Sequence, residues 1–349
     1  MASQKSISPG YNILLTGGTG FLGRFIISEL LGEDTLLPVK QLRVLDLNPL
    51  KNSSDPKITF IQGDVRDTAL LASSCKGIDL IIHSAAIVDW GTKSREEIMS
   101  VNYQATLNIL DAAKSNGIKA LVFTSSLDVL FDGMPLRNVN EETPYPDSHS
   151  TSYCESKYLA ELAIMKANGD SLKTCIIRPS DIYGEGDPYH IGSLIQMAKG
   201  GFYVRLGNGK SLCQHVYAGN VAHAHIGAAA ALLLGKSGVD GQAYFITDGP
   251  GTNFFTFFDR FVEGAGYRIW PKNLWLPRWL AYSIGCVSEA VAFLWRPVKK
   301  YSPKMSRFAV TYTCTDYTFN SDKAQGAFDF KPKYSKEEAF DRTMAYYRN

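Results

Sequence analysis

Residues 16–23 read Thr-Gly-Gly-Thr-Gly-Phe-Leu-Gly, and they follow directly on the apolar run 12–15. Glycines stand at every third position of this stretch. The first allows a tight bend, the second lets the backbone approach a pyrophosphate, and the third lets helix and strand pack closely. A helix that begins here also presents unpaired N–H groups to phosphate. The stretch therefore predicts a strand, a dinucleotide-binding turn and a helix, with a site made of Gly17, Gly20, Phe21, Leu22 and Gly23.

Apolar segments of strand length alternate with helical patterns through the first half of the chain. This alternation is typical of an α/β fold with a doubly wound, parallel Rossmann sheet. We expect strands over residues 12–16, 41–46, 58–62, 79–83, 120–125 and 174–178, and helices over residues 20–31, 96–116 and 153–168.

Carboxylates and small residues follow the predicted strands where a dinucleotide would lie. Asp46 ends the second strand, and a carboxylate there can accept both ribose hydroxyls of NAD while repelling the 2′-phosphate of NADP. No Arg or Lys lies within residues 17–23 to bind that phosphate, so we expect NAD. Asp64 and Val65 follow the third strand, where a carboxylate can meet the adenine amino group, although Asp64 can also be a plain turn residue. The small residues Ala85 and Ala86 follow the fourth strand and leave room for the dinucleotide.

The pattern changes after residue 178, where loops rich in glycine and proline and shorter elements begin. A helix at residues 220–234 and a strand at 243–247 still fit the sheet. We therefore expect a smaller C-terminal substrate lobe beside the NAD-binding Rossmann domain. The domain takes residues 1–178, with 211–248 adding a helix and a strand, and the lobe takes residues 179–210 and 249–349.

The composition indicates an ordinary globular protein of 349 residues, 45% hydrophobic and 20% charged. The net charge of +2 is small and no long basic run occurs, so nucleic acid is not an expected partner. The six cysteines never form CxxC and the six histidines are dispersed, so we expect a reducing compartment and no metal site. Residues 1–11 are polar, and no signal peptide is expected.

Tyr153 and Lys157 stand four residues apart in a helical pattern, so they share one helix face. The ordinary tyrosine pKa is about 10, and work near pH 7 requires a fall of roughly 3 units, or about 4 kcal/mol. An ammonium group at about 4 Å supplies a similar amount at an effective dielectric of about 20. The pair can therefore act as a general base, and together with the glycine turn it predicts hydride transfer to or from a nicotinamide.

Ser125 and Ser126 end the strand predicted over residues 120–125, at the edge of the sheet where ligands bind. A hydroxyl there can hold a substrate oxygen beside the tyrosine. A serine at this position can equally cap the helix or turn that follows. The residues alone leave both interpretations open.

Residues 274–296 form a membrane-associating candidate. Glu289 is the only formal charge in residues 279–295, tryptophan stands at both ends, and Arg278 and Arg296 flank the segment. A helix of this length spans roughly 26 Å, which is short of a hydrocarbon core of about 30 Å. We therefore expect a helix lying in one leaflet. The alternatives are a helix that packs over the substrate pocket and a true span.

These residues resemble the extended short-chain dehydrogenases/reductases, and within them the 3β-hydroxysteroid dehydrogenase family, which includes sterol-4-carboxylate 3-dehydrogenases. The resemblance covers essentially the whole chain. The stretches that carry it are TGGTGFLGR (16–24), IIHSAAIVDWG (81–91), FTSSLDVLFDG (123–133), YCESK (153–157), RPSDIYGEGD (178–187), VYAGNVAHAH (216–225), FLWRPVKKYSP (293–303) and FKPKYSKEEA (330–339).

The resemblance implies roles for individual residues. Tyr153 is then the catalytic acid/base, Lys157 lowers its pKa and binds the nicotinamide ribose, and Ser126 is the catalytic serine. Ser125 lies near the cofactor and Pro179 lines the nicotinamide. Asn102 matches a family asparagine, although the Val and Gly that follow it in the family are missing here. The family also implies a homodimer through helices 96–116 and 153–168, and a membrane-associated protein at the endoplasmic reticulum facing the cytosol, with a cytoplasmic location as the alternative.

The implied reaction is the oxidation of a steroid or sterol 3β-hydroxyl to the 3-ketone with NAD. The runner-up is a sterol-4-carboxylate 3-dehydrogenase, whose product loses carbon dioxide. A sugar-nucleotide epimerase or a non-catalytic dinucleotide-binding scaffold are further alternatives. Aromatic residues in the C-terminal lobe favour a flat lipid over a sugar diphosphate; they are Phe254, Phe255, Phe257, Phe258, Trp270 and Trp275.

Overall fold

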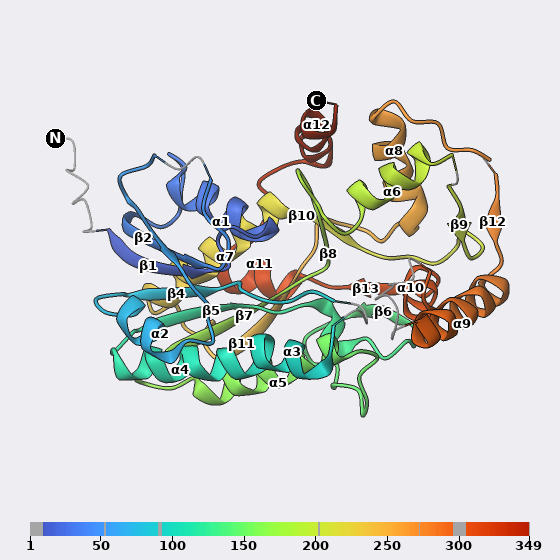
Figure 1. Cartoon of the computed structure of the whole chain (residues 1–349). Coiled ribbons are helices and arrows are strands. Elements are labelled where there is room, and N and C mark those ends of the chain that lie inside the picture. Colours follow the sequence, from blue (N-terminus) through green and yellow to red (C-terminus); the bar gives the residue numbers. More distant parts are fainter. Residues whose placement is uncertain are drawn as a thin grey trace.

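The computed structural model describes residues 10–51, 54–89, 93–201, 203–271, 273–295 and 305–348. Of the stretches named above, residues 90–91 and 296–303 lie outside the described residues. The predicted fold class is confirmed, because a seven-stranded parallel sheet forms the centre of the molecule (Figure 1). Its strands are β1 (Tyr11–Thr16), β2 (Val39–Asp46), β3 (Ile58–Gln62), β4 (Leu80–His83), β5 (Ala120–Thr124), β7 (Lys173–Pro179) and β11 (Gln242–Ile246).

The strand order β11-β7-β5-β4-β1-β2-β3 reverses direction between β1 and β4. Ligands of open α/β sheets bind in the crevice at such a switch point, beyond the carboxyl ends of the strands. Parallel strands covered on both faces read as continuous apolar runs, and all of β4 is buried. The two apolar faces explain why these short segments could be recognised in the sequence.

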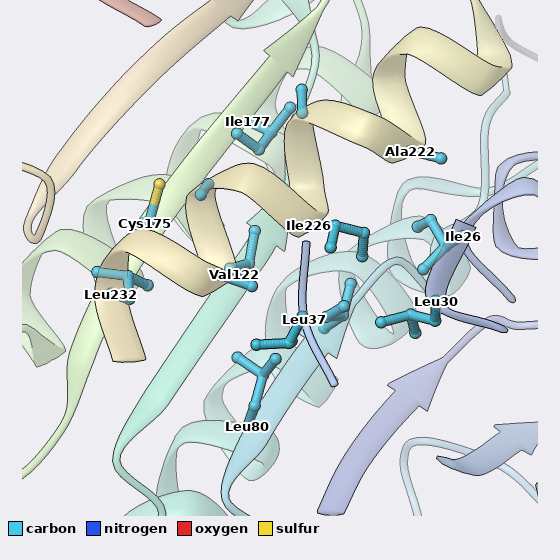
Figure 2. Close-up of a cluster of buried hydrophobic side chains, with 14 of the residues drawn as sticks. Ile26, Leu30, Leu37, Leu80, Val122, Cys175, Ile177, Ala222, Ile226 and Leu232 are labelled. Carbon is cyan, nitrogen blue, oxygen red and sulfur yellow. The ribbon is translucent and has the colours of Figure 1, made fainter. Parts of the chain in front are cut away.

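Helices cover both faces of the sheet (Figure 1). On one face, α1 (Phe21–Leu31) and α7 (Ala218–Leu233) pack on the strands, and Figure 2 shows Ile26 and Ile226 from these helices in one buried cluster with Val122 of β5. The helix α11 (Asp322–Phe328) adds Ala324 and Phe328 to the same core. The opposite face is covered by α2 (Thr68–Ser74), α4 (Ala105–Ser115) and α5 (Ser152–Ala167).

The single helix predicted over residues 96–116 is instead three consecutive segments. They are α3 (Arg95–Met99), a π-helical turn η1 (Ser100–Gln104) and α4. A π-helical turn inserts an extra residue into a helix and often marks a functional site. Here it carries Asn102, whose side chain holds two other elements together, as described below.

A second core, rich in aromatic residues, lies beyond the sheet. It includes most of residues 127–131, and strand β6 (Leu136–Val139) packs against it and pairs with the late strand β13 (Tyr317–Phe319). A segment within the predicted Rossmann domain therefore contributes to the lobe. The predicted domain boundaries themselves stay a prediction. The remaining elements are η2 (Leu127–Leu130), β6 (Leu136–Val139), β8 (Asp181–Tyr183), α6 (Ile191–Lys199), β9 (Arg205–Leu206), β10 (His215–Tyr217), α8 (Phe254–Gly264), β12 (Trp275–Leu276), α9 (Arg278–Trp295), α10 (Arg307–Thr313), β13 (Tyr317–Phe319) and α12 (Lys336–Tyr347).

Candidate active site

The glycine turn between β1 and α1 has the close contacts that glycine alone permits. Gly17 has φ +76°, and a Cβ built on it would lie 2.6 Å from the backbone nitrogen of Ala85. A Cβ on Gly23 would lie 2.1 Å from the carbonyl oxygen of Gly17. Larger residues would therefore push the turn away from the loop after β4 and away from the start of α1. Gly20 is the N-cap of α1, so the N-terminus of this helix opens at the turn.

A cavity of about 460 Å³ lies at the carboxyl ends of the strands, across the switch point between β1 and β4. The structure brings every predicted site residue to its lining. At the turn these are Gly17, Gly20, Phe21, Leu22 and Gly23; along the strand ends they are Asp46, Asp64, Val65, Ala85, Ala86, Ser125 and Pro179; and at the far end they are Ser126, Tyr153 and Lys157.

The two carboxylates of the cavity have different surroundings. Asp46 accepts a hydrogen bond from the Thr19 backbone N–H at 3.0 Å, which ties the end of β2 to the glycine turn. Asp64 instead pairs with Arg66 at 2.6 Å, and the hydrogen bond from this arginine holds the pKa of the Asp64 carboxyl below its usual value. Arg66 also lines the cavity, but its charge is matched by Asp64. Asp46 also lines the cavity, and none of the described residues forms an ion pair with it.

Tyr153 and Lys157 are positioned by the first turns of α5. Thr151 caps this helix by accepting a hydrogen bond from the Cys154 backbone N–H at 3.2 Å. The Lys157 ammonium group donates to the Thr124 carbonyl oxygen at the end of β5, at 2.8 Å. Both side chains are almost completely buried, with Tyr153 5% and Lys157 2% exposed. The contact joins α5 to the end of β5, and both residues line the cavity.

The pKa of Tyr153 moves in the direction opposite to the one expected from the lysine. Burial raises this pKa well above 10 and the charge of Asp128 raises it further, whereas a hydrogen bond with Ser126 lowers it. Burial also lowers the pKa of Lys157 to about 7, against the raising effect of Glu161. Desolvation thus opposes the charged form of both groups, because neither side chain reaches water. The local spacing of the two residues could not show this burial.

Ser126 begins the short helix η2 as its N-cap, which confirms the capping interpretation. Its hydroxyl oxygen accepts a hydrogen bond from the Asp128 backbone N–H at 3.2 Å, and the hydroxyl donates to Asp128 Oδ2 at 2.9 Å. The same hydroxyl lies at the cavity with the Tyr153 side chain. Capping and contact with a substrate are therefore compatible for this serine. The Ser125 hydroxyl is buried and has no hydrogen-bond partner among the described residues.

Asn102 holds the loop after β4 against α5 and is not part of the cavity lining. Its side-chain oxygen accepts from the Ile87 backbone N–H at 2.7 Å, and its amide group donates to the Ile87 carbonyl and to Ser156 Oγ at 2.9 and 3.0 Å. The π-helical turn thus positions the asparagine so that it links the loop after β4 to the helix that carries Tyr153. It does so without the Val and Gly of the family motif.

The aromatic residues expected to favour a flat lipid do not line this cavity. Phe254, Phe255 and Phe258 are buried in the second core, where the rings of Phe254 and Phe258 lie 5.0 Å apart, and Trp270 is 70% exposed. They are therefore packing or surface residues, and the substrate argument drawn from them is not supported. Sequence reasoning missed other residues at the far end of the cavity, namely Asp128, Asp181, Tyr189 and His190.

Comparison with known proteins gives a consistent picture. A family described as "3-beta hydroxysteroid dehydrogenase/isomerase family" matches residues 14–278. The chain is 35% identical to 3 beta-hydroxysteroid dehydrogenase type 7 of Mus musculus, over 95% of this chain and 94% of the mouse protein. It is 34% identical to the Homo sapiens protein of the same name, with the same coverage. Among solved structures, DesIV, a dTDP-glucose 4,6-dehydratase from Streptomyces venezuelae with NAD and TYD bound, is similar in fold, with a TM-score of 0.74, 21% identity and 97% of each chain covered.

Proposed function

The chain belongs to the 3-beta hydroxysteroid dehydrogenase/isomerase family, and from this premise we propose that it oxidises the 3β-hydroxyl of a steroid or sterol to the 3-ketone. The cofactor is NAD. The observation that carries the proposal is that Tyr153, Ser126 and Lys157 meet at one end of the cavity whose other end is the glycine turn.

The residues of the cavity fit a dinucleotide. Because Gly17 and Gly23 have no side chain, the turn keeps its backbone close to the cavity. The N-terminal N–H groups of α1 are available there for a phosphate. When bound, NAD supplies the hydride acceptor of the reaction. We assign Asp46 to the ribose hydroxyls, Asp64 and Val65 to the adenine side, and Ala85, Ala86, Ser125 and Pro179 to the strand edge on which the dinucleotide lies.

At the reacting end, each residue has a task that its contacts support. Tyr153 takes the proton from the 3β-hydroxyl as the C3–H bond gives up its hydride. Ser126 lies beside Tyr153 and holds the substrate oxygen. Lys157, fixed on the Thr124 carbonyl, places its charge at the end of β5 and assists the tyrosine when it is ionised. General acid–base catalysis of this kind contributes about 10²- to 10⁴-fold to a rate.

The test is NADH absorbance with the purified protein, NAD or NADP, and three substrates: a 3β-hydroxy-5-ene steroid, a 4-carboxysterol and a UDP-sugar. We expect NADH to form with NAD and a steroid. If mass spectrometry shows that the carboxysterol loses carbon dioxide, the decarboxylating alternative is selected. No NADH with either sterol, together with NAD-dependent conversion of the sugar, would overturn the proposal and favour an epimerase.

Asp46 is expected to set the preference for NAD over NADP. Asp46→Ala should raise KM for NAD by about 10- to 100-fold, because hydrogen bonds to a charged group are worth about 1.5–3 kcal/mol. The KM for NADP should fall or stay constant, since the carboxylate no longer repels the 2′-phosphate. Asp329→Ala is the control, because this carboxylate is 86% exposed, pairs with Lys236 and does not line the cavity. An unchanged ratio of NAD to NADP use in Asp46→Ala would contradict the assignment.

We also propose that α9 rests on a membrane surface. None of the helices that the structure describes combines the length and apolarity that crossing a bilayer requires. Small residues of α9 face inward, and a Cβ on Gly285 would lie 3.0 Å from the backbone nitrogen of Arg307 at the start of α10. Glu289, the only formal charge in residues 279–295, pairs with Arg307 at 2.6 Å. Large apolar side chains are left exposed: Trp279 71%, Val287 64%, Phe293 68%, Leu294 72% and Trp295 58%.

The membrane proposal predicts that replacing Trp279, Phe293 and Leu294 together by serine lowers binding to phospholipid vesicles by about a hundredfold or more, because each large apolar side chain contributes about 1.5–3 kcal/mol on burial. Vesicle cosedimentation measures this partition. Leu234→Ser is the control, because Leu234 is 79% exposed at the end of α7. Equal binding of the triple variant and the wild type would contradict the proposal.

We propose that the protein lies at the cytosolic face of the endoplasmic reticulum, with a cytoplasmic protein as the alternative. We also propose a homodimer through the segment α3–η1–α4 and α5, as the family implies. Sedimentation equilibrium in detergent-free buffer measures the assembly, and a monomer at micromolar concentration would contradict the dimer.

A further inference from the structure

A buried carboxyl group, Asp128, lies next to the reacting end of the cavity. Asp128 follows Ser126 by two residues in η2, is 6% exposed and lines the cavity together with Tyr153. Its Oδ2 accepts the Ser126 hydroxyl at 2.9 Å, and Ser126 lines the cavity together with Tyr153. The carboxyl group of Asp128 therefore stands directly behind the serine at the reacting end of the cavity. Its other oxygen, Oδ1, is buried and has no hydrogen-bond partner among the described residues.

Resting on the proposed dehydrogenase, we propose that Asp128 is a positioning residue for the reaction: it holds the Ser126 hydroxyl, and it places a carboxyl group beside the two hydroxyls that handle the substrate proton.

The hydrogen bonds of Ser126 depend on Asp128. A serine hydroxyl has one proton, and here Asp128 receives it. In the ketone product the substrate oxygen needs donors, and Ser126 can donate to it only when its proton is released from Asp128. A protonated Asp128 can instead donate to Ser126 and leave the serine proton for the substrate. The carboxyl group thus controls which way the serine hydroxyl points.

The charge of Asp128 acts on Tyr153 directly. Burial raises the pKa of Asp128 to about 7, the charge of Asp181 adds to this rise, and the hydrogen bond from Ser126 opposes it. Above this pH the ionised carboxylate raises the pKa of Tyr153, since two negative charges in a buried site repel each other. Removing the charge should therefore lower the pKa of Tyr153, and the oxidation should begin at a lower pH.

Other titratable groups surround this pair. Asp187 pairs with His190 at 3.4 Å, and although burial alone would lower the pKa of His190, the neighbouring carboxylates raise it to about 9. Tyr312 donates to Asp181 at 2.6 Å, and Tyr317 donates to the other oxygen of the same carboxylate at 3.0 Å. The titratable groups that act on Asp128 or Tyr153 are Asp181 from β8, Tyr189 and His190 before α6, Cys154 from α5 and Tyr312 from α10, and Asp187 acts on His190.

The test is the pH profile of kcat/KM for steroid oxidation between pH 5.5 and 10, in the wild type and in Asp128→Asn, Asp128→Ala and Asp248→Asn. In Asp128→Asn we expect the acidic limb to move down by about one pH unit. That shift corresponds to about a tenfold gain at a pH well below the wild-type limb. On the plateau, kcat should fall about tenfold in Asp128→Ala and less in Asp128→Asn, because the amide keeps a hydrogen-bond partner for Ser126.

Asp248→Asn is the matched control for a buried carboxyl group. Burial raises the pKa of Asp248 to about 7, as for Asp128, but Asp248 bonds to the Tyr217 backbone N–H at 2.7 Å and to Asn220 at 3.0 Å, away from Tyr153. Its substitution should leave the limb in place. Circular dichroism and NAD binding verify folding, and Asp128→Asn retains the size of the side chain if Asp128→Ala fails to fold.

Two results would overturn the inference. The role of Asp128 alone would be overturned if the wild type is active and the acidic limb of Asp128→Asn coincides with that of the wild type. The same holds if Asp248→Asn shifts the limb as much as Asp128→Asn does. A wild type that binds NAD but oxidises no steroid at any pH would overturn the proposed function, and with it this inference.

Discussion

Replacing Tyr153 with phenylalanine is expected to lower kcat for steroid oxidation by about a thousandfold while NAD binding stays within about twofold. The substitution removes only the hydroxyl oxygen. The ring remains to fill its almost completely buried position, and the glycine turn and Asp46 at the other end of the cavity are unaffected. Steady-state kinetics measure the first quantity, and calorimetric titration with NAD measures the second.

A matched control lies on the same helix. The Tyr158 ring packs edge-to-face against Tyr145, with ring centroids 4.7 Å apart, and it does not line the cavity, so Tyr158→Phe should keep most of the activity. If Tyr153→Phe lost NAD binding as well as turnover, the tyrosine would be needed for the shape of the site, and its assignment as the acid/base would be wrong.

The second large effect is expected at a buried ion pair between α5 and β7. Arg178 and Glu161 are 2% and 0% exposed, and Arg178 Nη2 lies 2.7 Å from Glu161 Oε2. The Tyr145 hydroxyl donates to the same carboxylate oxygen at 2.7 Å. Breaking a buried pair on one side leaves an uncompensated charge, which costs about 3–5 kcal/mol. We therefore expect Arg178→Met to lower the free energy of unfolding by about this amount, measured by urea unfolding followed by circular dichroism.

Restoring neutrality should recover most of the loss. The double variant Arg178→Met/Glu161→Leu removes both charges from the interior and is expected to be more stable than either single variant, since desolvation opposes each buried charge. An exposed pair gives the comparison: Lys236 and Asp329 lie 3.0 Å apart at the surface, and Lys236→Met should change the free energy of unfolding by less than about 1 kcal/mol. A single Arg178→Met variant within about 1 kcal/mol of the wild type would contradict the prediction.

Consequences for the active site follow from the same pair. Glu161 stands one turn after Lys157 on α5, and Arg178 directly precedes Pro179 at the end of β7. The ion pair thus fixes the helix that carries Tyr153 against a strand that reaches the cavity. Breaking the ion pair in Arg178→Met should therefore also change kcat, with little change in the KM for NAD.

Much of the fold could be predicted because its signals are local. Strand β3 has the predicted bounds, and β1, β2, β4, β5, β7 and β11 differ from theirs by one or two residues at an end. Buried parallel strands are apolar throughout, and glycine marks the first turn, so a short window of sequence is enough to recognise them. The helix over residues 96–116 was placed correctly, but its π-helical turn was not foreseen, because that turn depends on Asn102 reaching Ile87 and Ser156.

The predicted site residues all line the cavity, but Asp128, Asp181, Tyr189 and His190 at its far end were not predicted, and neither was the electrostatics of the site. In a parallel sheet the carboxyl ends of all strands meet at one edge, so residues that follow separate strands can be assigned to one cavity from the sequence. The sequence alone determined the doubly wound fold, the NAD turn and the meeting of Tyr153, Lys157 and Ser126. Only the tertiary structure decided that Lys157 bonds to the Thr124 carbonyl, that Asp128 stands behind Ser126, and that Glu289 faces α10 while the tryptophans of α9 face outward. The reason is physical: strand and turn signals arise between neighbours in the chain, but burial and charge depend on groups that only folding brings together.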